Sequence, residues 1–338
     1  MNKVIVSVVM PVYNEEKYID KCIDSLLKQD YPLENMEWIF VDGMSSDHTK
    51  EILIKKQQEM PELIQVYDNP YKIVPYAMNI GIKKSSGKYI IRLDAHAEYA
   101  PDYFSKCVHY LETIDADNVG GVAETKAKSR QGQAIARMLS SKFGVGNSQF
   151  RTNGESGYVD TVPFGAFKRE VFQKWGGYDE RLVRNQDNEM NFRIRKNGGK
   201  VYLANDIHLS YYCRDSIKGI AQMGMKNGTW NVITLKLCPG AMGLRHFIPL
   251  IFVLSHLFLF PMSFVHPAFA WIWGLEWVLY LSLDLIFSVK AASGLKDFLL
   301  LIMLFPVFHI AYGSGSVKGI FKLMTKEFRD NGYAPNKI

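Results

Sequence analysis

The chain has 338 residues, of which 48% are hydrophobic, and its formal net charge is +6. That length allows one large α/β domain together with a second region. There is no Lys- or Arg-rich run of the nucleic-acid-binding kind, so the modest positive charge suits a membrane surface or anionic phosphates instead. The four cysteines are scattered without ligand spacing, which indicates reduced thiols facing a cytosol and not a disulfide framework.

Short apolar runs alternate with amphipathic segments over the first hundred residues. The opening run resembles the start of a signal peptide, but it is followed by polar residues in place of a small-residue cleavage site, so we expect a buried strand. The alternation predicts an α/β fold with a mostly parallel sheet and helices on both faces. Strands are expected at residues 4–12, 37–41, 63–67 and 88–93, and helices at 16–28, after 47, and at 75–84.

The last third of the chain is dominated by large apolar residues. Two stretches, about 247–265 and 268–289, are long enough to span a membrane, and a shorter apolar helix is expected at about 298–313. The basic flanks of the first two predict a hairpin whose ends face the cytoplasm. Because the basic tail also favours that side, we expect the third helix to be re-entrant or interfacial. We therefore predict one domain over 1–235 and membrane-associated helices over 236–338; a wholly buried hydrophobic subdomain is the disfavoured alternative.

The fourth expected strand ends in Asp94, Ala95 and His96. An acidic residue and a second metal-capable residue, two positions apart at the carboxyl end of a strand, can share a hard divalent cation. Open α/β sheets bind their ligands at this edge, where such a cation could neutralise a diphosphate. The ordinary alternative is that Asp94 is a turn residue or a helix cap.

Other polar clusters follow the remaining strands. Asn14 and Glu15 could bond to a base or ribose, with a plain helix cap as the alternative, and Asp42 could accept a hydrogen bond from a base imide. Further along, a helix begins near Asp187. Glu189 and Arg193 lie one turn apart on that helix and could equally form an i,i+4 salt bridge.

Taken in order, these motifs carry a resemblance. VSVVMPVYNEE, VDGMSSDHT, LDAHA, GGYDE and QDNEMNFRIRKNG are similar to the ordered motifs of family 2 glycosyltransferases, over about residues 4–214. The phrases DNPYKIVPYAMNIGIKKSSGKYIIRLDAHA, FGVGNSQFR and HIAYGSG resemble the succinoglycan-biosynthesis type of membrane glycosyltransferase. The resemblance implies a GT-A fold, a nucleotide-sugar donor and a C-terminal helical membrane region.

The resemblance also implies roles for individual positions. Asp187 matches the catalytic base, with Gln186 in place of the usual Glu, while His96 replaces the second acid of the metal motif and favours Mn²⁺ over Mg²⁺. His208 is a lesser metal candidate, because Tyr211 lies nearer the position of the family's late histidine. Matched to the nucleotide sugar are Pro11, Tyr13, Asn14, Glu15, Asp42 and Asp94, and to the acceptor side Gly165, Trp175, Gly177, Tyr178, Asp179, Glu189 and Arg193.

The resemblance implies transfer of a single sugar, with inversion, from a nucleotide-diphospho-sugar whose base is commonly uridine. The implied acceptor is a polyprenyl-diphosphate-linked saccharide in exopolysaccharide or capsule synthesis. The implied location is the cytoplasmic membrane, multi-pass, with the catalytic domain in the cytoplasm. One alternative is a processive synthase, disfavoured because the Gln/Arg-x-x-Arg-Trp motif is missing, and the other is an inactive scaffold derived from a transferase. A dinucleotide-dependent oxidoreductase is excluded, since no Gly-rich turn follows the first strand.

Overall fold

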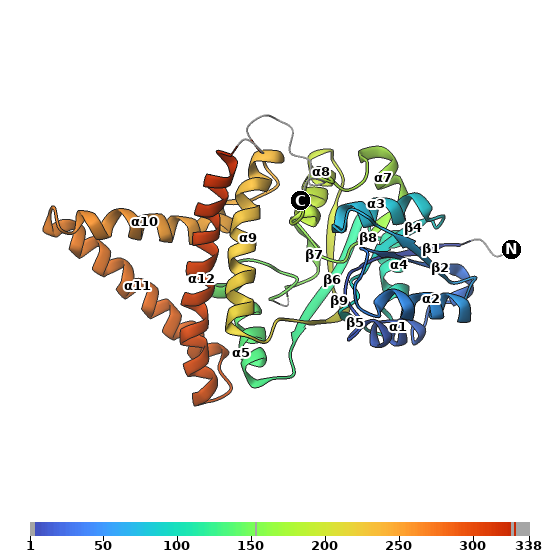
Figure 1. The fold of residues 1–338 in the computed structure, drawn as a ribbon, viewed down its shortest axis with the longest axis horizontal. Coiled ribbons are helices and arrows are strands. Elements are labelled where there is room, and N and C mark those ends of the chain that lie inside the picture. The colour runs from blue at the N-terminus through green and yellow to red at the C-terminus, as the bar shows by residue number, and fades with distance from the viewer. Residues whose placement is uncertain (1–3, 153, 326–327, 329–338) are drawn as a thin grey trace. The chain divides into compact units, whose positions relative to one another are not determined.

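The computed structural model describes residues 4–152, 154–325 and 328 (Figure 1). The described chain divides into two compact units. The first unit comprises residues 4–124 and 154–211, and the second comprises Thr125–Thr152 together with residues 212–325 and 328.

The first unit is built on one mixed sheet. Its strands follow the order β3-β2-β1-β4-β8-β6-β9-β5, and β7 pairs with β9. β3, β2, β1 and β4 pair with one another in parallel. β8 pairs in antiparallel fashion with β4 and β6, and β5 and β7 each pair in antiparallel fashion with β9. The α/β fold predicted from the alternating pattern is thus confirmed. The strands are β1 Val6–Val12, β2 Met36–Asp42, β3 Ile64–Asp68, β4 Tyr89–Arg92, β5 Ala97–Tyr99, β6 Asn118–Lys126, β7 Gly157–Tyr158, β8 Ala166–Lys168 and β9 Val201–Tyr212.

Helices cover the sheet because its central strands are apolar on both faces. Every residue of β2 is buried, as expected of a parallel strand with helices on either side. The buried residues of α1, Ile19, Cys22, Ile23 and Leu26, recur at helical spacing and form one stripe. The helices of this unit are α1 Ile19–Leu27, α2 Thr49–Glu59, α3 Val74–Lys84, α4 Tyr103–Thr113, α7 Arg169–Trp175 and α8 Gln186–Lys196, with a 3-10 turn at Leu33–Asn35.

Strand register sets where the polar clusters gather. Val12 of β1 lies opposite Asp42 of β2, and Val9 of β1 lies opposite Arg92, the last residue of β4. The carboxyl ends of β1, β2 and β4 therefore meet at one edge of the sheet. The segments that begin at Tyr13, Gly43 and Leu93 all leave the sheet from that edge, which is where open α/β sheets bind ligands.

The second unit is helical. In it α9 packs along α12 through small residues: a Cβ on Gly228 would meet the Tyr312 carbonyl, and one on Gly315 would meet Met225. Such close backbone approach is typical of helix packing within membranes. The helices are α5 Arg130–Leu139, α6 Lys142–Val145, α9 Ile217–Leu237, α10 Ile248–Met262, α11 Pro267–Ala291 and α12 Leu295–Leu323, and a 3-10 turn, Leu244–Phe247, precedes α10.

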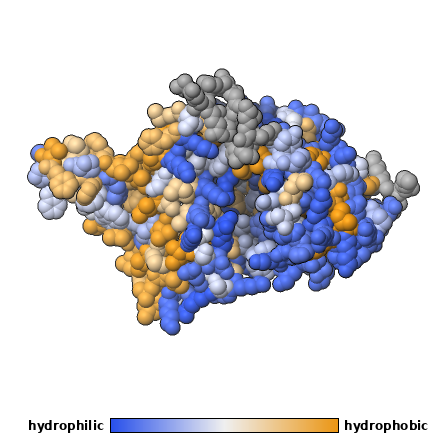
Figure 2. All heavy atoms as spheres, in the orientation of Figure 1, coloured by the Kyte–Doolittle hydropathy of each residue, from blue (hydrophilic) through white to orange (hydrophobic). Residues whose placement is uncertain are grey.

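Three helical segments of this unit are long and apolar enough to cross a membrane: Leu244–Met262, Pro267–Ala291 and Leu295–Leu323. Figure 2 shows apolar side chains gathered over α10, α11 and α12. The third helix runs well past the expected end at 313. Gly313 and Gly315 lie within α12 and do not terminate it. Their lack of a side chain lets α12 pack closely against α10 and α9. That the third helix is re-entrant or interfacial, and that the first unit lies in the cytoplasm, remain predictions.

The second unit also takes in sequence that we assigned to the transferase domain ending at 235. The segment Thr125–Thr152 supplies α5, whose Ile135 and Met138 are buried in one cluster with Leu301 and Phe305 of α12. Arg137 of α5 forms an ion pair with Asp297, which is buried at the start of α12. The backbone therefore passes from one unit to the other three times, after Glu124, between residues 152 and 154, and after Tyr211, and not at a single boundary.

Candidate active site

The loop between β4 and β5 carries Asp94 and His96. Tyr99, buried on β5, fixes this loop: its hydroxyl accepts a hydrogen bond from the Asp94 amide at 2.8 Å and lies 3.1 Å from the Asp94 carbonyl. Burial raises the pKa of Tyr99 well above its ordinary value, so the hydroxyl stays protonated. The short β5 strand thus holds the loop that carries Asp94 and His96.

His96 is oriented by two neighbours. Its Nδ1 lies 3.0 Å from Oε1 of Glu15, a residue of the loop after β1. Because Ala97 pairs with Tyr211 on β9, the Tyr211 ring meets the His96 ring edge to face, with centroids 5.2 Å apart. Glu15, predicted to hold the nucleotide, is therefore also placed to orient the imidazole.

The loops after β1 and β2 are joined to each other. Asn14 has a positive φ of 55°, which asparagine tolerates, and its Oδ1 accepts from the Ser46 amide at 2.8 Å. The Asp42 carboxylate is fully buried and accepts from the amide and hydroxyl of Ser45 at 3.0 and 2.5 Å. In the structure Asp42 therefore builds the loop, and its contact with a base stays a prediction. Pro11 is half-buried in β1, and Tyr13 is exposed beside Gly43.

Asp187 lies in the first turn of α8. The residue before that helix, Asn185, adopts the left-handed conformation with φ 64°, so the chain turns sharply as it enters α8. The Asp187 carboxylate forms an ion pair with Arg92, the last residue of β4. Arg92 also lies 3.5 Å from the Asp94 carboxylate, measured from Nη2 to Oδ1. One buried guanidinium therefore contacts the predicted base and the predicted donor-site acid.

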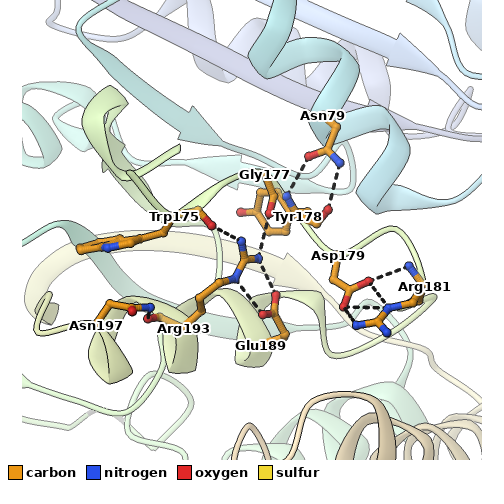
Figure 3. Close-up of polar contacts among 9 residues, drawn as sticks. All are labelled: Asn79, Trp175, Gly177, Tyr178, Asp179, Arg181, Glu189, Arg193 and Asn197. Carbon is orange, nitrogen blue, oxygen red and sulfur yellow. Dashed lines mark hydrogen bonds and ion pairs between the residues drawn. The ribbon is translucent and has the colours of Figure 1, made fainter. Parts of the chain in front are cut away.

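The segment predicted to line the acceptor side, Trp175 to Asp179, is a loop held from two directions (Figure 3). Arg193 donates to the carbonyls of Trp175 and Gly177 at 2.5 and 2.8 Å, and it pairs with Glu189 through two hydrogen bonds of 2.8 and 2.7 Å. The i,i+4 salt bridge expected from the sequence is thus present. Gly176 between the two carbonyls has φ 81°, a conformation that favours glycine.

Asn79 of α3 holds the other end of this loop. Its side chain donates to the Tyr178 carbonyl at 2.9 Å and accepts from the Tyr178 amide at 2.8 Å, as Figure 3 shows. Burial raises the pKa of Tyr178 to about 12, so its phenol stays neutral. Asp179 is bound by Arg181 at 2.9 and 2.7 Å. Glu189 and Arg193 therefore support the loop, and direct contact of either with an acceptor stays a prediction.

The family is decided by comparison with known sequences. The model described as "Glycosyl transferase family 2" matches residues 7–176, half of the chain. The chain belongs to glycosyltransferase family 2. This family 2 chain is a glycosyltransferase, and it transfers sugar from a nucleotide-sugar donor.

Two glycan-biosynthesis proteins are similar to this chain, and the two alignments differ in length. The Methanococcus voltae protein "Dolichyl N-acetyl-alpha-D-glucosaminyl phosphate 3-beta-D-2,3-diacetamido-2,3-dideoxy-beta-D-glucuronosyltransferase" is 28% identical, over 94% of this transferase and 97% of its own length. "Succinoglycan biosynthesis protein ExoA" of Rhizobium meliloti is 31% identical over 61% of this chain and 63% of its own. The resemblance to that biosynthetic type is confirmed at this level.

Solved structures confirm the GT-A fold. The mannosyltransferase PcManGT from Pyrobaculum calidifontis, in complex with GDP-Man and Mn²⁺, aligns with a TM-score of 0.59 at 18% identity, over 95% of this transferase and 88% of that chain. Residues 1–349 of S. aureus TarS in complex with UDP align with a TM-score of 0.50 at 15% identity, over 95% and 92% of the two chains. At these identities the likeness is one of fold.

Few side chains of the predicted site could bind a metal ion. Among the residues that the structure describes, no three His, Cys, Asp or Glu side chains group to hold a metal ion. Asp94 and His96 offer one carboxylate and one imidazole, a donor set that Mn²⁺ accepts and that a diphosphate could complete. His208, the lesser metal candidate, lies 3.8 Å from Glu124, measured from Nδ1 to Oε1. The Gly165 carbonyl accepts a hydrogen bond from the Arg92 amide at 3.0 Å, so Gly165 has a structural contact in the sheet. Asp94 and His96 are therefore chemically suited to a metal held jointly with the donor.

Sequence reasoning missed three residues that shape this transferase's site. Arg92 had a visible signal, because it is a lone charge in the apolar run YIIRL. Asn79 had none, since an amide on a helix carries no sign of the loop that it will bind. Tyr99 looked like an ordinary apolar strand residue, and its hydrogen bonds to Asp94 follow only from the short turn before β5.

Proposed function

We propose that this chain transfers one sugar, with inversion, from a nucleotide-diphospho-sugar to a lipid-linked saccharide at a membrane. The base of the donor is proposed to be uracil, and the product to be part of an exopolysaccharide or capsule. The observation that carries the proposal is the grouping of Asp94, Asp187 and Arg92: a donor-site acid and a candidate base, brought together at the ligand-binding edge of a GT-A sheet.

The candidate base is supported by its position. Asp187 is partly exposed, comes from the helix after the acceptor-side loop, and is held through Arg92. An acceptor hydroxyl is a poor nucleophile until a base takes its proton in the transition state. In the proposal the Asp187 carboxylate accepts that proton as the hydroxyl oxygen attacks the anomeric carbon. The bond to the diphosphate breaks from the opposite face, which inverts the configuration.

The donor end is assigned to the loops after β1, β2 and β4. Asn14, Glu15 and the exposed Tyr13 face a nucleotide in the proposal, while Asp42 and Ser45 keep the β2 loop in shape. Asp94 and His96 would hold Mn²⁺ or Mg²⁺, which when bound neutralises charge on the leaving diphosphate. Glu15 contributes by fixing the His96 ring through Nδ1.

A lipid-linked acceptor is supported by the second unit and by one relative. Three helices of membrane-spanning length and composition follow the catalytic sequence. The name of the Methanococcus voltae relative specifies a dolichyl phosphate-linked sugar as its acceptor, and the two proteins align over 94% of this chain. We therefore propose that the lipid stays in the bilayer while its head group reaches the site, with the catalytic unit in the cytoplasm.

The test is a donor panel on the purified full chain in detergent with Mn²⁺. UDP-, GDP- and dTDP-sugars are incubated with and without polyprenyl-diphosphate-linked saccharide, and free nucleoside diphosphate and extended lipid are measured. We expect one donor class to release nucleotide and one sugar to be added, both abolished by EDTA. Long polymer from one donor would favour a processive synthase instead, and failure of every donor would favour an inactive scaffold.

A further inference from the structure

Arg92 is a buried charge that no motif of the sequence explains. It ends β4, whose four residues are all buried, and it is 4% exposed. A guanidinium in such surroundings is costly unless it is paired. Arg92 has two carboxylate partners, Asp187 and Asp94, and its Nε has no hydrogen-bond partner among the described residues.

The two partners come from distant parts of the sequence and have different proposed roles. Asp94 belongs to the donor-side loop after β4, whereas Asp187 is the proposed base in the first turn of α8. Both carboxylates are more accessible than the arginine, with side-chain exposures of 21% and 27% against 4%. The guanidinium is thus the inner member of the cluster, and the carboxylates are the members that a substrate can reach.

We propose that Arg92 is a positioning residue, which sets the separation and orientation of the base relative to the donor-site acid. This inference rests on the proposed function. Without a cation between them, two carboxylates that also face an anionic diphosphate would repel one another. Arginine suits this place because its planar fork can meet two carboxylates at once, whereas a lysine ammonium is a single point charge.

A positioning role for Arg92 predicts that its replacement affects the rate of transfer more than nucleotide binding. Since Arg92 is buried beneath its partners, its loss is expected to leave the nucleotide contacts of the loops after β1 and β2 in place. The cost should fall on the reaction step, because a base displaced by about 1 Å can lose roughly 100-fold in rate. Arg92→Lys should keep the charge and recover part of that loss.

The experiment uses the full chain in detergent and the donor that the wild type turns over fastest. UDP, GDP and dTDP are each titrated with Mn²⁺ by calorimetry, and the tightest wild-type binder is used for every variant. For Arg92→Gln we expect kcat to fall at least about tenfold while the Kd of the nucleotide stays within about threefold. Arg169→Gln is the matched control: Arg169 is a half-buried arginine of the same unit whose hydrogen bonds are to Gly87 and Ser85, and its replacement should leave kcat unchanged.

A double-variant cycle separates positioning from mere structural support. If Arg92 acts through Asp187, then Arg92→Gln should slow the Asp187→Asn enzyme by no more than about twofold, because the base is already gone. An equal loss in both backgrounds, or an unchanged kcat in Arg92→Gln, would overturn the inference. Should the glutamine variant not fold, Arg92→Lys carries the same cycle. A wild type inactive with every donor refutes the proposed function, whereas an active wild type with an unaffected Arg92→Gln refutes only this role.

Discussion

Replacing Arg193 by methionine tests whether the acceptor-side loop depends on a buried ion pair. The change keeps the length of the side chain but removes both hydrogen bonds to Glu189 and those to the carbonyls of Trp175 and Gly177. Glu189 is buried, so its carboxylate would be left without the charge that compensates it.

The expected cost follows from that uncompensated charge. Removing one partner of a buried pair typically costs about 3–5 kcal/mol, and each kcal/mol lowers the melting temperature of a domain of this size by about 2–4 °C. Arg193→Met should therefore melt roughly 6–20 °C below the wild type. The double variant Glu189→Leu with Arg193→Met should lose less than the single one, because no lone buried charge remains.

Melting temperatures are measured by scanning fluorimetry in detergent. Arg181→Met is the matched control: Arg181 also binds a carboxylate, that of Asp179, but it is about half exposed, so its loss should cost less than about 1 kcal/mol. The reasoning is refuted if Arg193→Met melts with the control, or if the double variant melts below Arg193→Met.

Three further predictions concern the site and the second unit. Asp187→Asn should retain nucleotide binding and lose at least about 100-fold in transfer, checked by titration and product formation, and near-normal turnover would remove Asp187 as the base. Glu15→Ala should weaken Mn²⁺ binding about 10- to 100-fold, followed by paramagnetic resonance with UDP present; unchanged affinity would separate Glu15 from His96. Arg137→Gln should leave the buried Asp297 with only the longer ion pair to Arg130 at 3.7 Å, so proteolysis within Thr125–Thr152 should quicken, and an unaltered cleavage rate would contradict the role of the Arg137 ion pair.

Much of the first unit could be predicted from the sequence because its signals are local. The strands at Val6–Val12 and Met36–Asp42 are mostly apolar runs, and each is followed by polar residues where the chain leaves the sheet. The pair Glu189 and Arg193 follows from helical spacing alone. Expectations of this kind need only the few residues around each position.

What the sequence could not supply depends on contacts between distant segments. Nothing near Asn14 indicates that its side-chain oxygen will accept a hydrogen bond from the amide of Ser46, 32 residues further along the chain. The third apolar helix was expected to end near 313, because GSGS resembles a helix stop, yet Gly313 and Gly315 are sites of close helix packing. The assignment of Thr125–Thr152 to the second unit was hidden for the same reason, since the apolar stripe of α5 does not reveal what it will cover.

The segment Thr125–Thr152, which belongs to the second unit, determines how the protein can be divided into fragments. A fragment that stops at residue 235, where the apolar helices would be trimmed away, keeps α5 and loses Leu301, Leu304 and Phe305, against which Ile135 and Met138 are buried. Those side chains would then face water, and such surfaces favour aggregation. A fragment limited to the first unit therefore needs two excisions: everything after Tyr211, including α9, and the segment Thr125–Thr152 with α5 and α6, whose ends are bridged by a short polar linker.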